Sequence, residues 1–177
     1  MNRQPNNTIP AKPITIIQLN CNKKDYIIHS LLNQHIYDTD ILLLQEPSWG
    51  HIGADTQGTD IRGPIGHRSW ISLLPYASYN LNNKQPWVML YYQQQDGLEV
   101  ALCSDLVRDR DIQAINVIYL GQPTTMIINI YNDPTCLDNN AICILQNLDL
   151  PTNRPVILSQ KVTYLFCDEL NIDSKSL

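Results

Sequence analysis

The stretch ITIIQLN at residues 14–20 decides the architecture together with the two segments that follow it, KDYIIHSLLNQHI at 24–36 and DILLLQE at 40–46. The first and third are short and almost continuously apolar, which is typical of strands covered on both faces. In the middle segment the apolar residues recur at intervals of three and four, so they gather on one face of a helix. The pattern predicts a strand, a helix and a second strand.

If two strands joined in this way share one sheet, we expect them to be parallel and the crossover between them to be right-handed. Asn20 and Glu46 then lie at the same carboxyl edge of the sheet, which is where ligands tend to bind. Pro47 ends the second strand because it lacks an amide proton, and it is expected to bias Glu46 towards an extended backbone.

The rest of the chain predicts a succession of strands and one more helix. Strands are expected at residues 70–74, 87–92, 98–102, 112–119, 124–131 and 155–159, and the helix at 137–148. Residues 50–64 carry four glycines without periodicity and predict a long surface loop. The pair Asp96-Gly97 is a hairpin turn signal between the strands at 87–92 and 98–102. This order predicts one α+β layered sandwich.

The composition of the 177 residues, with 44% hydrophobic and 16% charged, is typical of one globular domain. The apolar stretches are far shorter than the ~20 residues that cross a bilayer, so no membrane contact is expected. Residues 1–13 predict a disordered lead without a secretory signal, and hence an intracellular protein, with nucleus and cytoplasm both open. The net charge of -5 predicts weak, salt-sensitive binding to nucleic acid.

Three predicted strand ends carry short motifs in a fixed order: QLNCN at 18–22, LLLQEP at 42–47 and NIYNDP at 129–134. This ordered set, over residues 14–159, resembles the endonuclease/exonuclease/phosphatase superfamily. The residues of the motifs are most similar to those of the endonuclease domain of non-LTR retrotransposons. The resemblance implies a DNase I-like fold of two sheets with flanking helices. It also implies DNA as the substrate, Mg²⁺ or Mn²⁺ as the cofactor, and a reverse transcriptase linked to the domain in an intact element.

The resemblance also assigns roles to three residues. Glu46 would bind the divalent cation, since Mg²⁺ prefers hard carboxylate oxygens. Asn20 would bind or support the metal shell through its amide, and Tyr131 would contact the scissile phosphate with its hydroxyl. The plainer alternatives are a solvated glutamate, an asparagine that caps a turn and a half-buried strand aromatic. Lys23 and Lys24 are interpreted as a solvated helix start, with contact to a DNA phosphate as the alternative.

The sequence departs from the family after Ser159. There the family continues into Gly-Asp-x-Asn, which supplies the general base, and later into a histidine segment, whereas this chain reads Ser159-Gln160-Lys161-Val162. Residues 160–177 are therefore predicted to be a divergent tail, the fold to be an incomplete DNase I-like fold, and the truncated domain to be inactive alone. The alternatives are a superfamily phosphatase acting on a small phosphate ester, and an inert remnant or interaction module.

Overall fold

The computed structural model describes residues 13–35, 38–75, 85–132 and 141–160. The expected lead and tail lie outside these ranges apart from Pro13 and Gln160. The elements are β1 (Ile16–Asn20), α1 (Asp25–Gln34), β2 (Ile41–Gln45), β3 (Gly50–Ala54), β4 (Asp60–Gly63), β5 (Trp70–Leu73), β6 (Val88–Gln93), β7 (Leu98–Leu102), β8 (Ile112–Tyr119), β9 (Thr125–Ile130), α2 (Ala141–Gln146) and β10 (Val156–Gln160).

The first sheet has the strand order β1-β2-β6-β5. The strands β1 and β2 are parallel, with Asn20 opposite Gln45, and α1 forms the crossover between them. β6 runs antiparallel to both β2 and β5. The predicted strand, helix and strand at the start of the chain are therefore confirmed, as is their parallel pairing.

The second sheet has the strand order β10-β9-β8-β7. β7, β8 and β9 are antiparallel neighbours, whereas β10 pairs with β9 in parallel after the chain passes through α2. The helix expected at 137–148 is observed over Ala141–Gln146, and residues 137–140 lie outside the described part of the chain.

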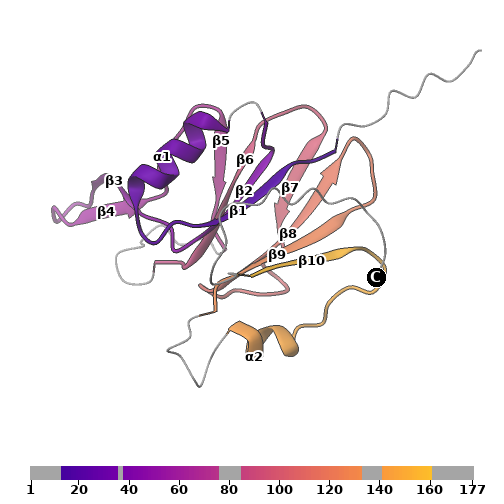
Figure 1. Cartoon of the computed structure of the whole chain (residues 1–177). Coiled ribbons are helices and arrows are strands. Elements are labelled where there is room, and N and C mark those ends of the chain that lie inside the picture. Colours follow the sequence, from indigo (N-terminus) through magenta and orange to yellow (C-terminus); the bar gives the residue numbers. More distant parts are fainter. Residues whose placement is uncertain (1–12, 36–37, 76–84, 133–140, 161–177) are drawn as a thin grey trace, which may run out of the picture.

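The two sheets pack face to face, and each carries a helix on its outer side, as Figure 1 shows. One apolar cluster fills the space between α1 and the first sheet, a second lies between the sheets, and a third lies between the second sheet and α2. Along β2 the side chains alternate, because Leu42 and Leu44 face α1 while Ile41 and Leu43 face the second sheet. The predicted α+β layered sandwich with flanking helices is confirmed.

Buried side-chain amides join the two sheets at several points. Asn129 on β9 donates through Nδ2 to the carbonyls of Leu44 (3.1 Å) and Met89 (3.2 Å), which are cross-strand partners on β2 and β6. In the reverse direction, Gln45 Nε2 on β2 donates to the Ile130 carbonyl at 2.6 Å. These amide clamps, defined as Asn129 and Gln45, fix the ends of β2 and β9 relative to each other.

The expectation of a long loop at 50–64 is wrong. Residues Gly50–Ala54 and Asp60–Gly63 form an antiparallel two-stranded ribbon, β3 and β4. Its turn is closed by the Asp55 carboxylate, which accepts the backbone N–H groups of Gln57 and Thr59, and Gly58 has a φ of +79°. Most of the ribbon is exposed, so its sequence lacks the alternation that a half-buried strand shows.

The expected hairpin at Asp96-Gly97 is also wrong. The strands before and after this turn belong to different sheets, since β6 pairs with β2 and β5 while β7 pairs with β8. Gly97 has a φ of +80°, and its carbonyl accepts the N–H of Leu120 at 2.8 Å. A tight turn therefore carries the chain from one layer to the other. Across the described residues, no helix has the length and apolar character needed to span a membrane.

Candidate functional site

The three motif-bearing strand ends meet at one end of the sandwich. Parallel pairing places the end of β1 beside the end of β2, where the Cys21 N–H donates to the Gln45 carbonyl at 2.8 Å. The hydrogen bond from Gln45 to Ile130 then ties the end of β9 to the same point. Asn20, Glu46 and Tyr131 each lie at, or one residue beyond, one of these ends, so the fold brings all three predicted site residues into one region.

Asn20 supports Glu46 directly. Its Nδ2 donates to Glu46 Oε1 at 2.9 Å, and its Oδ1 accepts the Asn22 N–H at 2.8 Å. The second contact fixes the orientation of the amide, because only the oxygen can accept a backbone N–H. Asn20 therefore closes the expected turn and also holds the Glu46 carboxylate, while its part in a metal shell stays a prediction.

The backbone of Glu46 is not extended, contrary to the expectation from Pro47. Its φ is +45°, in the left-handed region. The Glu46 N–H donates to the Trp87 carbonyl, and the Glu46 carbonyl accepts the Lys23 N–H, both at 2.8 Å. These long-range hydrogen bonds outweigh the local steric preference of a residue before proline, and Asn22 and Lys23 have positive φ angles of 48° and 56° beside it.

Cys21 lies beneath this turn and is completely buried, with 0% of its surface exposed. Burial, with a further contribution from the negative charge of Glu46, raises the pKa of its thiol to about 12. The reactive thiolate is therefore scarce at neutral pH. Cys21 is a packing residue below the site.

We expect Cys21 to resist alkylation in the folded protein while Cys143, which is exposed on α2, reacts readily. Treatment with iodoacetamide at mildly alkaline pH, followed by peptide mass spectrometry, measures each position separately. In urea both cysteines should react. Labelling of Cys21 at the rate of Cys143 without denaturant would contradict the burial of this turn.

Tyr131 is buried and stacks on Trp87, with ring centroids 5.3 Å apart and an interplanar angle of 15°. Its N–H donates to the Asp111 carbonyl at 2.8 Å, and the Trp87 N–H donates to the Arg110 carbonyl at 2.7 Å. Trp87 thus links the other two residues: its carbonyl accepts the N–H of Glu46, and its ring stacks on that of Tyr131. Sequence reasoning did not assign Trp87 to the site, because its contacts come from distant segments and its own motif is only the start of a strand.

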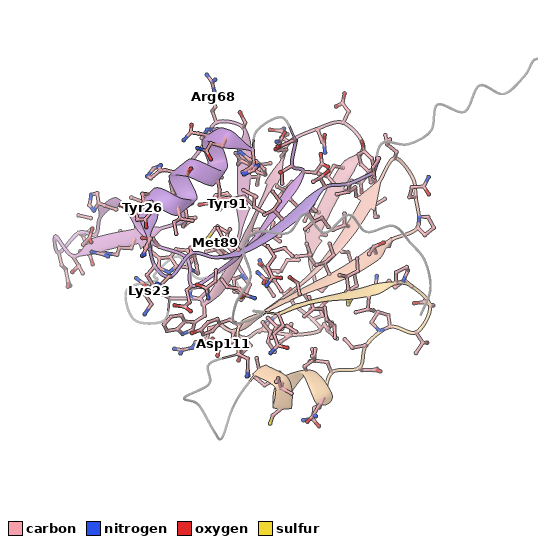
Figure 2. All side chains as sticks on the ribbon, in the orientation of Figure 1. Lys23, Tyr26, Arg68, Met89, Tyr91 and Asp111 are labelled. Atoms are coloured by element: carbon pink, nitrogen blue, oxygen red, sulfur yellow. The ribbon has the colours of Figure 1, made fainter. Side chains whose placement is uncertain are left out.

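Two cations lie over the Trp87 ring. Lys23 Nζ is 4.2 Å from the ring centroid, and Arg110 Cζ is 5.5 Å from it. Figure 2 shows Lys23 and Asp111, the residue after Arg110, at the same end of the molecule. Lys24, by contrast, lies over Tyr26 on α1, with Nζ 5.9 Å from that centroid. The two neighbouring lysines therefore have different surroundings.

The protein groups at Glu46 fit a hydrated cation. Among the described residues there is no group of three or more His, Cys, Asp or Glu side chains that could hold a metal ion. Mg²⁺ is commonly held by only one or two carboxylates, keeps several waters and takes further oxygens from substrate phosphates. A half-buried carboxylate oriented by a neighbouring amide suits such binding, whereas a cage built of protein ligands alone would need more donors than Glu46 and Asn20 supply.

Comparison with known proteins finds a distant likeness among solved structures. No family model matches the sequence, and no curated protein matches it. Among solved structures the chain is similar to the endonuclease domain of TRAS1, a telomere-specific non-LTR retrotransposon, with a TM-score of 0.44 and 16% identity. The similar region covers 71% of this chain and 48% of that one, so the chain spans about half the length of that domain.

Proposed function

We propose that this chain carries the metal-binding and phosphate-binding half of a DNA phosphodiester endonuclease site, of the kind found in the endonuclease/exonuclease/phosphatase superfamily. The observation that supports it most is the hydrogen bond of 2.9 Å from Asn20 to Glu46 across the ends of two parallel strands. Two separate motifs of the resemblance meet in that contact. The third motif reaches the same region through the stack of Tyr131 on Trp87.

In this proposal Glu46 binds Mg²⁺ or Mn²⁺ through its carboxylate, and Asn20 keeps that carboxylate in one orientation. When bound, the cation polarises a phosphoryl oxygen and stabilises the leaving oxygen. Tyr131 contacts the phosphate with its hydroxyl, and its stacked ring restricts the positions that the hydroxyl takes. The short, left-handed connection after β1 and β2 fixes the spacing of these groups.

The sequence directly after Ser159 does not supply the general base that the resemblance leads us to expect there. Where the resembled family has Gly-Asp-x-Asn after the last strand, this chain has Gln160 and Lys161 after Ser159. A positioned general acid or base contributes about 10²–10⁴-fold to rate. We therefore propose that these residues bind cation and phosphate without efficient turnover. A phosphatase acting on a small ester is the second candidate, favoured by the net charge of -5.

The experiment that tests the proposal is a Mn²⁺ titration of the purified protein, followed by electron paramagnetic resonance. Wild-type protein should bind one ion, and Asn20→Ala should weaken binding by about 10- to 100-fold, the usual effect of losing a group that orients a metal ligand. Glu46→Gln should weaken it at least as much, because the charged donor itself is lost. Glu99→Gln, which removes an exposed carboxylate on β7, is the matched control and should leave binding unchanged. Equal affinities in wild type and Glu46→Gln would overturn the proposal.

A further inference from the structure

The indole of Trp87 is the centre of a cluster of side chains, of which the proposed reaction uses Tyr131 but gives no role to Lys23 or Arg110. Tyr131 stacks on it, and Lys23 and Arg110 place their charged groups 4.2 Å and 5.5 Å from its centroid. These four residues come from four separate segments, so the cluster is a product of the fold. We name it the indole cluster.

The charges of the indole cluster are held in place. Lys23 has a left-handed backbone, and its N–H donates to the Glu46 carbonyl, which anchors it one hydrogen bond from the proposed metal ligand. Cation–π attraction then draws its ammonium to the ring face. Within the described residues Lys23 forms no ion pair with a carboxylate. Arg110 forms one with Asp111, with 3.4 Å between its Nε and Asp111 Oδ1.

Two positive groups over one ring repel each other, and an anion between or beside them would relieve that repulsion. Both side chains are exposed, so an anion can reach them from solvent. Glu46 contacts Trp87 through its backbone N–H, while the two cations lie over the ring, so we place this anion beside the phosphate at Glu46. A ligand that fills both places needs two phosphate groups on one chain.

We propose that Lys23 and Arg110, held over Trp87, form a subsite for the phosphate next to the one at Glu46, and that the site thus selects an oligonucleotide strand over a small phosphate monoester. This inference rests on the proposed function, since Glu46 defines the first phosphate position. It assigns specificity to residues outside the three recognised motif positions. It also decides between the two candidate substrates.

The test measures binding of a fluorescein-labelled single-stranded DNA by anisotropy over a range of salt concentrations, with EDTA present so that metal binding does not contribute. Lys23→Ala should lower the salt slope by about 0.7, which corresponds to roughly fivefold weaker binding at about 0.1 M salt. Arg110→Ala should act similarly. Lys24→Ala and Arg108→Ala are the matched controls, since they remove the same charges one and two residues away, outside the indole cluster.

Competition adds a second readout. A 5′-phosphorylated dinucleotide, which has two phosphate groups, should displace the labelled strand from wild type better than a mononucleotide does, and Lys23→Ala should remove that preference. Equal losses in Lys23→Ala and Lys24→Ala would show only a general charge effect and would overturn the subsite. Absence of strand binding by wild type at low salt would also overturn it. Neither result changes the Mn²⁺ titration, so failure of the subsite is distinguishable from failure of the metal site.

Discussion

Replacing Asn129 with alanine is expected to lower the free energy of unfolding by about 3 kcal/mol. The side chain is buried, and its Nδ2 donates to the carbonyls of Leu44 and Met89 in the opposite sheet. Each buried group that loses its hydrogen bond costs about 1–3 kcal/mol, and two carbonyls are affected. Urea denaturation measures the loss as a lower transition midpoint at an unchanged slope.

Asn116→Ala is the control for this substitution. Asn116 is half-buried on β8 of the same sheet, and its amide oxygen has no hydrogen-bond partner in the described part of the chain. We expect its replacement to cost less than about 1 kcal/mol. Equal destabilisation by the two variants would mean that amide clamps do not hold the sheets together. A larger loss for Asn129→Ala should be accompanied by weaker Mn²⁺ binding, because Asn129 and Gln45 fix the strand ends that position Glu46.

The second large effect concerns catalysis. Purified protein should leave supercoiled plasmid intact in Mg²⁺ or Mn²⁺, because the general base and the phosphate-orienting asparagine expected after Ser159 are replaced by other residue types. Losing both is expected to reduce the rate by about 10⁴-fold or more, as each such group contributes about 10²–10⁴-fold. Joining the Gly-Asp-x-Asn continuation of the resembled family, and the segment beyond it, after Ser159 should produce nicking.

Glu46→Ala separates this activity from a contaminating nuclease, which would be insensitive to the substitution. In the extended protein, nicking should disappear with Glu46→Ala. Robust nicking by the chain of 177 residues that Glu46→Ala abolishes would contradict the claim of inactivity and confirm the metal site. Nicking that persists in Glu46→Ala would identify a contaminant.

Much of the layered fold could be predicted because the central strands of its two sheets are buried on both faces. β2 is buried at all five positions, and an uninterrupted apolar run such as Ile41–Leu44 marks such a strand in the sequence. The ribbon of β3 and β4 could not be predicted, because its strands are mostly exposed and exposed strands carry no apolar pattern. The pair Asp96-Gly97 does form the turn that the sequence predicts, but local sequence does not say whether the next strand pairs with the previous one.

Some residues of the candidate site could be predicted from the sequence and others could not. Asn20, Glu46 and Tyr131 could be selected from the sequence because each follows a predicted strand and belongs to an ordered motif. Trp87 and Arg110 could not, because their importance arises only where β6 and β8 begin beside the ends of β1, β2 and β9. The left-handed backbone of Glu46 was missed because distant hydrogen bonds impose it.

Three of the four non-glycine residues with positive φ in the described part of the chain, Asn22, Lys23 and Glu46, lie at this site. A side chain in that conformation costs about 1–2 kcal/mol, which glycine would avoid. A mutation from glutamate to glycine at position 46 would therefore increase the stability of the fold by relieving backbone strain. The same mutation would remove the side chain that we propose binds the cation directly. If selection acted only on the amount of folded protein, glycine would be favoured at position 46. A glutamate kept at this position in related sequences would therefore indicate selection for its carboxylate.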